Sequence, residues 1–295
     1  MIKLTLLLCW FCIYTYSEIK GPEKLGIGIM PYIHTDKKGH MHVVSGFSKM
    51  INYYKSTVPG VFEPVVMIPS GLSSGTVNYT RIISDKNDNL HICFTNGTLD
   101  GSQKIFYLNN IGGIWTQAVQ IASSQMRMVG PRIKVDDSLN VFITSGKDDS
   151  YGGTSDLIKV TDVTGTPTRE KHIMIDGRVA HLGIDSNGIV HLIYSDTKSV
   201  YWEKYNSDLT MIGSRIKVSN GIIGGLTETV GADMGPDQEM HYICEKIAGA
   251  LMMPFYNNTG RSDQDAINSN IYTAASGRSF NPIPVWINDT IFFIF

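Results

Sequence analysis

The chain has 295 residues and a mass of 32.7 kDa, enough to bury a large core in one domain or two. Its 25 Lys and Arg residues against 27 Asp and Glu residues give a net charge of −2, which argues against a nucleic-acid binder or a polybasic membrane binder. A hydrophobic content of 42% excludes wholesale disorder, and 29 glycines predict a turn-rich, β-rich protein.

The N-terminal segment has the pattern of a secretory signal. Lys3 precedes an apolar run from Leu4 to Tyr14, which leads through Ser17 into a polar sequence. We therefore expect residues 1–17 to be a signal peptide and the protein to be secreted; a buried N-terminal strand is the alternative. The run is too short for a comfortable membrane span, and no later stretch is long enough to be one.

Four sequons for N-linked glycosylation fit a secreted protein, at Asn78, Asn96, Asn257 and Asn288. After removal of the signal, only Cys93 and Cys244 remain. They fall on equivalent strands of repeat units that lie three units apart, farther than a disulfide can reach. We expect both cysteines to be reduced.

A period of about fifty residues organises the rest of the chain. Six similar apolar segments are anchored, at intervals of 49, 51, 49, 50 and 51 residues, on His42, His91, Phe142, His191, His241 and Phe292. An aspartate stands six residues before each of the first four anchors, at Asp36, Asp85, Asp136 and Asp185. Because aspartate caps tight turns, each copy predicts a β-hairpin.

In at least three copies, an aromatic third strand follows the hairpin, as at Lys104–Leu108. A fourth strand then closes the unit, as at Ala118–Ile121. Four short strands per period indicate a β-propeller blade, so we expect an all-β propeller. A single domain over 18–295 would hold about five and a half blades, and a six- or seven-bladed parent is indicated. The predicted blades are 26–70, 77–122, 130–176, 178–220, 228–275 and a partial one at 282–295.

The repeated histidines could be interpreted as metal ligands. They lie on separate blades at the same phase, however, whereas a ligand set must converge on one point. Phe142 and Phe292 occupy the same position, so it accepts an aromatic ring. We therefore predict a packing role for these histidines and a capping role for the turn aspartates, with no metal and no cofactor.

A more informative position lies four residues before each turn, on the innermost strand. It holds Tyr32, Arg81, Arg132, His181 and, if the fifth turn is two residues shorter, Asp233; His34 lies on the same face as Tyr32. Side chains of equal phase should point the same way, toward the axis. Packing alone would favour small or apolar residues there, so the polar set predicts a ligand site. A water-filled channel is the alternative.

Two segments resemble a known family. Residues 185–195 followed by Tyr201–Lys204 resemble BNR-repeat, sialidase-like propellers, and residues 39–46 with 52–56 are similar to the branch that includes ulvan-type polysaccharide lyases. The resemblance implies a propeller fold and a carbohydrate partner. The Ser-x-Asp-x-Gly-x-Thr-Trp box and the Phe-Arg-Ile-Pro signature of true sialidases are absent, which argues against sialidase activity.

These observations leave three functions open. The first is a secreted lectin-like module that binds an acidic glycan through Arg81, Arg132, Asp233 and His34. The second is a polysaccharide lyase, in which an arginine neutralises a uronate carboxylate while His181 and Tyr32 act as base and acid. The third is a protein-interaction propeller, because fold does not imply function. Whether the protein is an enzyme stays open.

Overall fold

The computed structural model describes residues 25–58, 61–97, 103–124, 127–148, 154–196, 199–220, 230–248, 251–260, 283–287 and 290–294. Within these ranges the chain consists of strands, turns and connecting loops. The expected signal peptide, residues 1–17, lies outside them. No helix long and apolar enough to cross a membrane occurs in this part of the chain.

The strands form antiparallel sheets in chain order. The first blade contains β1 (Ile29–Thr35), β2 (Met41–Phe47) and β3 (Met50–Val58), with β4 (Val61–Phe62) and β5 (Val66–Pro69) both pairing with β3. The second contains β6 (Thr76–Ser84), β7 (Leu90–Gly97), β8 (Gln103–Asn109) and β9 (Val119–Ser124). The third contains β10 (Arg127–Val135), β11 (Val141–Asp148), β12 (Ser155–Thr161) and β13 (Thr168–Ile175).

The remaining blades follow the same order. The fourth contains β14 (Arg178–Ile184), β15 (Val190–Ser195), β16 (Ser199–Tyr205) and β17 (Ile216–Asn220). The described part of the fifth contains β18 (Val230–Met234), β19 (Met240–Ala248) and β20 (Leu251–Asn258). The sixth sheet pairs β21 (Ile283–Ile287) with β22 (Thr290–Ile294), the two strands predicted for the partial unit.

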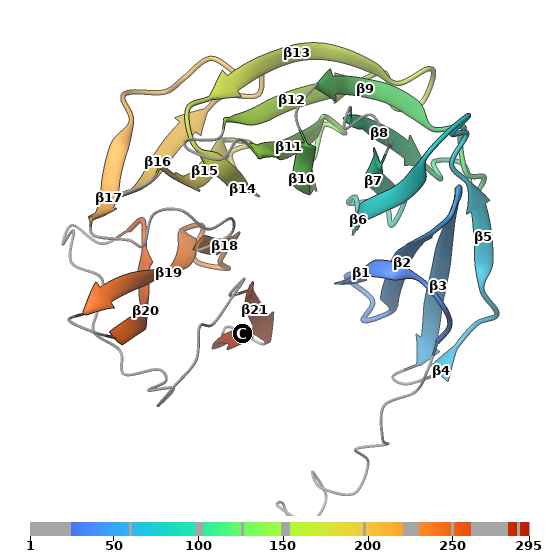
Figure 1. Cartoon of the computed structure of the whole chain (residues 1–295), viewed down its shortest axis with the longest axis horizontal. Helices are drawn as coiled ribbons and strands as arrows, with labels where there is room; N and C mark the ends of the chain where they lie inside the picture. Colours follow the sequence, from blue (N-terminus) through green and yellow to red (C-terminus); the bar gives the residue numbers. More distant parts are fainter. Residues whose placement is uncertain are drawn as a thin grey trace, which may run out of the picture.

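These sheets are arranged around a common centre, with β1, β6, β10, β14, β18 and β21 innermost (Figure 1). From β1 to β21, each inner strand contacts the inner strand that follows it in the chain. The protein is therefore an all-β propeller, as the fifty-residue period predicts.

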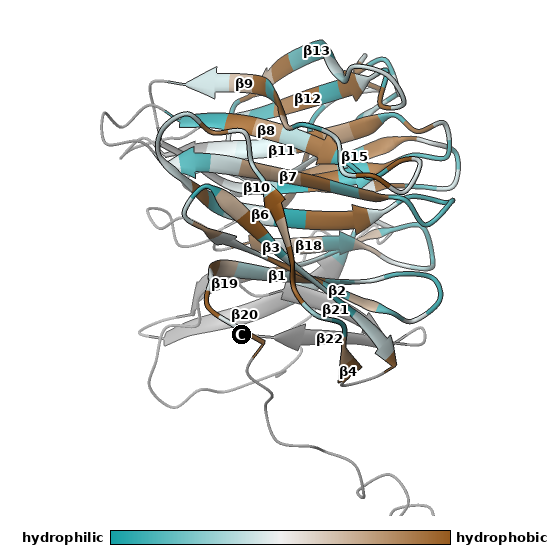
Figure 2. Cartoon of the chain, turned by 90° about the vertical axis from the view of Figure 1, so that its right-hand side faces the viewer, coloured by the Kyte–Doolittle hydropathy of each residue, from teal (hydrophilic) through white to brown (hydrophobic). Residues whose placement is uncertain are grey.

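The hydrophobic core lies between neighbouring blades. Val44 and Ile51 of the first blade pack with Ile82 and Ile92 of the second, and comparable clusters lie between the second and third, third and fourth, and fourth and fifth blades. In Figure 2 brown segments alternate with teal ones along β6, β7 and β8, and several turns between strands are teal. Because each fully buried Val, Ile or Leu contributes about 1.5–3 kcal/mol, packing between blades holds the ring together.

The first four hairpin turns share one geometry. In the second blade, the Oδ1 atom of Asp85 accepts the backbone N–H groups of Asn87 (2.8 Å) and Asn89 (2.9 Å). The carboxylates of Asp36, Asp136 and Asp185 accept the same pair of N–H groups in their own turns. The predicted capping role is confirmed.

The fifth turn corrects the predicted register. Met234 pairs with Met240, so the turn spans residues 235–239 and is as long as the others. Gly235 takes the place of the aspartate, and a Cβ atom there would lie 2.4 Å from Asp237 Oδ1. The Asp237 carboxylate fills the space that a side chain at position 235 would need. The prediction of a shorter fifth turn, and hence of Asp233 as the equivalent of Arg81, is wrong.

A β-bulge recurs on the inner strands of the first four blades. Two residues face one residue of the second strand, and the bulge pairs are 30–31, 79–80, 130–131 and 179–180. The first residue of the pair has a positive φ at Met30 (49°), Tyr79 (47°) and Gly130 (56°). Such bulges bend a strand and re-aim the side chain that follows. Each of these bulges immediately precedes a residue of the predicted site.

Candidate functional site

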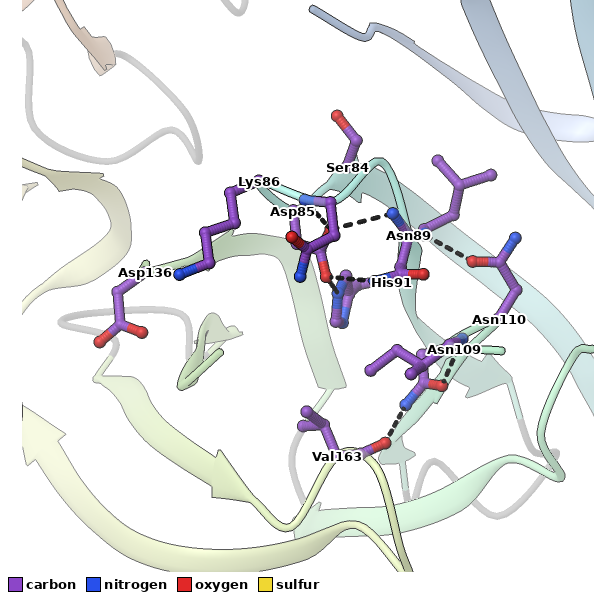
Figure 3. A network of polar contacts seen from close by, with 12 residues as sticks. Ser84, Asp85, Lys86, Asn89, His91, Asn109, Asn110, Asp136 and Val163 are labelled. Atoms are coloured by element: carbon purple, nitrogen blue, oxygen red, sulfur yellow. Dashed lines mark hydrogen bonds and ion pairs between the residues drawn. The ribbon is translucent and has the colours of Figure 1, made fainter. Parts of the chain in front are cut away.

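The repeated histidines prove to be buried hydrogen-bond bridges. In the second blade, His91 Nε2 lies 3.3 Å from Asp85 Oδ2 (Figure 3). On the other side of the ring, His91 Nδ1 lies 2.6 Å from the hydroxyl of Tyr107. The same link joins a turn carboxylate, a histidine and a third-strand aromatic residue at Asp36–His42–Tyr53, Asp185–His191–Trp202 and Asp237–His241–Tyr256. Since all four imidazoles are buried inside their own blades, the predicted packing role is confirmed.

The pairing of each inner strand with the second strand of its blade places the predicted site residues at two sets of equivalent positions, here called two tiers. The first tier faces the second strand at equivalent positions and contains Tyr32, Arg81, Arg132, His181 and, in the fifth blade, Gly231. The second tier lies two residues further along and contains His34, Ile83, Lys134, Gly183 and Asp233. Asp233 is therefore a neighbour in register of His34, not of Arg81.

Direct contacts join the first and second blades within these tiers. The Arg81 guanidinium lies 4.7 Å from the ring centroid of Tyr32, a cation–π contact. The backbone N–H of Ser84 donates to His34 Nε2 (3.1 Å), and the Ser84 hydroxyl oxygen lies 2.8 Å from the same nitrogen. His34 therefore uses Nε2 as an acceptor.

One ion pair links the third and fifth blades. Lys134 Nζ lies 2.7 Å from Asp233 Oδ1, although the two residues are 99 positions apart in the chain. Lys134 was missed by the sequence argument. The signal was available, because Lys134 stands two residues after Arg132, as His34 stands two residues after Tyr32.

The carbonyl groups of the bulges hold the two arginines. Arg81 Nη1 donates to the carbonyl of Thr80 (2.9 Å), and Arg132 Nη1 donates to those of Gly130 (2.9 Å) and Pro131 (3.3 Å). Within the described residues, no carboxylate lies within ion-pair distance of Arg132. This guanidinium keeps donors available for an anionic ligand.

The charges of the tier residues influence the pKa values of the two histidines, His34 and His181. Burial lowers the pKa of His34 to about 4; His42 and Lys134 act in the same direction, and the carboxylates of Asp36 and Asp233 oppose them. Burial also holds the pKa of His181 well below 6.5; Arg132 and Arg81 lower it further, against hydrogen bonds to the backbone of the fifth blade. Both imidazoles are therefore neutral near pH 7.

His181 has a further unusual property. Its side chain is buried, and its Nε2 atom has no hydrogen-bond partner among the residues that the structure describes. Leaving a buried polar atom without a partner costs about 1–3 kcal/mol. Such an atom beside two arginines is a candidate for contact with a ligand.

The charge of the two tiers is unbalanced. Three cationic side chains, Arg81, Arg132 and Lys134, stand against the single carboxylate of Asp233, and both histidines are neutral. The described residues contain no group of three or more His, Cys, Asp or Glu side chains suited to a metal ion. The arrangement is suited to holding a carboxylate or a sulfate group.

A separate cavity of about 390 Å³ lies between the fourth and fifth blades, near their hairpin turns. Asp185, His191 and Trp202 form part of its wall, and these three residues make up the structural bridge of the fourth blade. None of the predicted ring residues lines this cavity.

Other predicted residues fall in different places. Cys93 and Cys244 are both buried thiols, as expected. Asn96 is buried, and its side-chain oxygen accepts the backbone N–H of Lys104 (2.7 Å). A glycan attached to Asn96 is incompatible with this buried position. Asn78 is half-buried on β6, Asn257 lies on β20, and Asn288 lies outside the described residues.

Comparison with known proteins supports the fold. The sequence matches no protein-family model and no curated protein. The structure is similar to a protein of unknown function from Dyadobacter fermentans, with 10% identity, 80% of each chain covered and a TM-score of 0.54. It is also similar to a Hadza microbial sialidase, with 11% identity and a TM-score of 0.51 over 79% of this chain. The chain spans 57% of the length of that sialidase.

A third similar structure is an ulvan lyase bound to a saccharide, at 11% identity and a TM-score of 0.49, covering 81% of this chain and 68% of that one. At such identities the first two similarities establish a shared fold. The class of the protein is thus a β-propeller with a cationic cluster on its inner strands.

Proposed function

We propose that this chain is a secreted β-propeller that binds an acidic carbohydrate through the two inner-strand tiers. The excess of positive charge carries this proposal, because the described residues of the two tiers include three half-buried cations, Arg81, Arg132 and Lys134, and one carboxylate, Asp233. Guanidinium groups bind carboxylate and sulfate bidentately, which a neutral sugar cannot match. One protein with a similar fold is named a sialidase. The apolar run of residues 4–14 supports secretion.

The test removes each arginine in turn. Arg81→Ala and Arg132→Ala should weaken binding of hexagalacturonate, a uronate oligosaccharide, by roughly 10- to 100-fold, because each deletes a charge-assisted contact. Binding would be measured by isothermal titration calorimetry, with neutral xylohexaose as the comparison ligand.

The matched control is Arg169→Ala, because Arg169 is exposed on the outermost strand of the third blade. Arg215 is unsuitable, since its Nε donates to the buried carboxylate of Glu203 (2.9 Å) and its loss would disturb folding. If Arg81→Ala and Arg132→Ala both bind the acidic ligand as tightly as the parent does, the two tiers line only a water-filled channel and the proposed function is wrong.

A second function, β-elimination of a uronate-containing glycan, is favoured by one observation. Among the residues that the structure describes, Nε2 of the buried, neutral His181 imidazole has no hydrogen-bond partner, and the charges of Arg132 and Arg81 act on this side chain. As a base it would take the proton at C5; the C5–H electron pair forms the C4–C5 double bond, the C4–O bond breaks, and Tyr32 protonates the leaving oxygen.

The two functions separate in one assay. A lyase generates an unsaturated uronate, which absorbs ultraviolet light, and His181→Ala should abolish this signal while binding persists. A parent protein that binds hexagalacturonate without any rise in absorbance is a lectin-like binder.

A further inference from the structure

The ion pair between Lys134 and Asp233 lies among the residues of the proposed site. Lys134 belongs to the third blade and Asp233 to the fifth, and the equivalent position of the blade between them is Gly183. The two side chains are 28% and 35% exposed, so water reaches both charges. Their contact is a single one, through Oδ1 of the carboxylate.

The Asp233 carboxylate is only lightly held. Its Oδ1 atom also accepts the backbone N–H of Met234 (3.0 Å), and within the described residues it makes no other hydrogen bond besides that to Lys134. An ion pair that is partly exposed and monodentate is weak, because water and salt screen it. An incoming anion can therefore displace Asp233 from Lys134.

We propose that Lys134 is a third anion-binding residue of this site, and that Asp233 is an internal competitor that occupies it in the ligand-free protein. This inference rests on the proposed function, since it assumes an acidic ligand at the same tiers. The acidic group of the ligand takes the place of the Asp233 carboxylate on Lys134 Nζ, and the two negative charges repel each other. Asp233 then lowers affinity instead of contributing to it, in contrast to the ligand-binding role that the sequence suggests.

The two partners of the pair should respond with opposite signs. Asp233→Asn should bind hexagalacturonate about 3- to 10-fold more tightly, because it frees Lys134 and removes a repulsive charge. The asparagine oxygen still accepts the Met234 N–H, so the strand end is preserved. Lys134→Gln should bind about tenfold more weakly, because a charge-assisted contact is lost. Binding would be measured by titration calorimetry at constant ionic strength, and xylohexaose binding should not change.

A double variant tests whether the effect passes through Lys134. In a Lys134→Gln background, Asp233→Asn should give a much smaller gain, since there is no cation left to release. The matched control is Asp88→Asn, because Asp88 forms a similar exposed ion pair with Lys38 (2.6 Å) between the first and second blades. This control should leave the affinity unchanged.

The possible results separate this inference from the proposed function. If Asp233→Asn binds hexagalacturonate no more tightly than the parent, or the gain persists without Lys134, the competitor role is overturned. In that case, weaker binding by Arg81→Ala and Arg132→Ala still supports the acidic-glycan site. If neither arginine substitution changes the affinity and no variant binds hexagalacturonate, both the proposed function and the competitor role of Asp233 are overturned.

Discussion

At the scale of single residues, the contacts of His191 in the fourth blade fix the position of its proton. The indole Nε1 of Trp202 can only donate, and it lies 3.3 Å from His191 Nδ1. His191 Nδ1 must therefore accept, and its Nε2–H donates to Asp185 Oδ2 (3.2 Å). A second proton on Nδ1 would place two donors face to face, so the bridge requires a neutral imidazole.

His91 offers the cleanest test of these bridges. Burial lowers the pKa of His91, while the hydrogen bond and negative charge of Asp85 oppose the shift. In His91→Phe, Asp85 keeps the Asn89 side-chain donor (2.8 Å), which matches the third blade, where Phe142 accompanies Asp136 and Asn140. We expect a loss of about 1–2 kcal/mol at pH 7, but a smaller further loss on acidification than in the parent.

Urea unfolding at pH 7 and pH 5 would measure both quantities. His40→Phe is the comparison variant, because it removes a half-buried turn imidazole that contacts Asp36 (3.1 Å) but does not link a turn carboxylate to a third-strand aromatic residue. If His91→Phe and the parent lose the same free energy of unfolding between the two pH values, the buried imidazole is not a source of acid sensitivity.

At the scale of elements, neighbouring blades approach each other closely at two glycines, Gly46 and Gly183. A Cβ atom at Gly46 on β2 would lie 2.1 Å from the backbone oxygen of Val77 on β6. A Cβ atom at Gly183 on β14 would meet the Met240 sulfur at 2.3 Å and the Met234 methyl group at 2.9 Å. The first conflict is with backbone and the second mainly with flexible side chains.

These two glycines should therefore differ in their tolerance of alanine. We expect Gly46→Ala to lower the free energy of unfolding by about 3 kcal/mol or more, because β2 and β6 must separate. Gly183→Ala should cost only about 1 kcal/mol, since the methionines can move. Equal losses for both variants in urea unfolding would show that the blade contacts are not as rigid as this comparison requires.

At the scale of the whole molecule, lowered pKa values predict sensitivity to acid. Burial lowers the pKa values of five histidines, His34, His42, His91, His181 and His191. A group whose pKa is lower in the folded state contributes stability that is full above its unfolded pKa, near 6.5, and that is lost as pH falls through the folded pKa. For His34 this window extends down to about pH 4.

Two turn carboxylates act in the same direction at lower pH. Burial alone would raise the pKa values of Asp36 and Asp85, but their hydrogen bonds more than offset it and hold both below the usual 3.8. We expect Tm to be highest above pH 6.5, to fall between pH 6.5 and 4, and to fall again below pH 4. A series of thermal melts across this range would measure the change. A Tm that stays constant from pH 7 to pH 4 would contradict the buried-histidine account.

The sequence by itself determined the propeller, the hairpin turns and the buried role of the repeated histidines. Each of these depends on residues close together in the chain, such as Asp85 and His91, and the fifty-residue period repeats them. The same local pattern placed Tyr32, Arg81, Arg132 and His181 at equivalent register positions.

Only the tertiary structure decided which of these residues act together. The fifth turn kept its length because Asp237 fills the space beside Gly235, a packing detail that turn patterns do not encode. Lys134 on the third blade contacts Asp233 on the fifth because the arrangement of the blades around the centre, rather than sequence spacing, sets which inner-strand side chains lie within reach. Local patterns fix the direction of a side chain relative to its own strand, whereas its partners depend on how the blades pack around the centre.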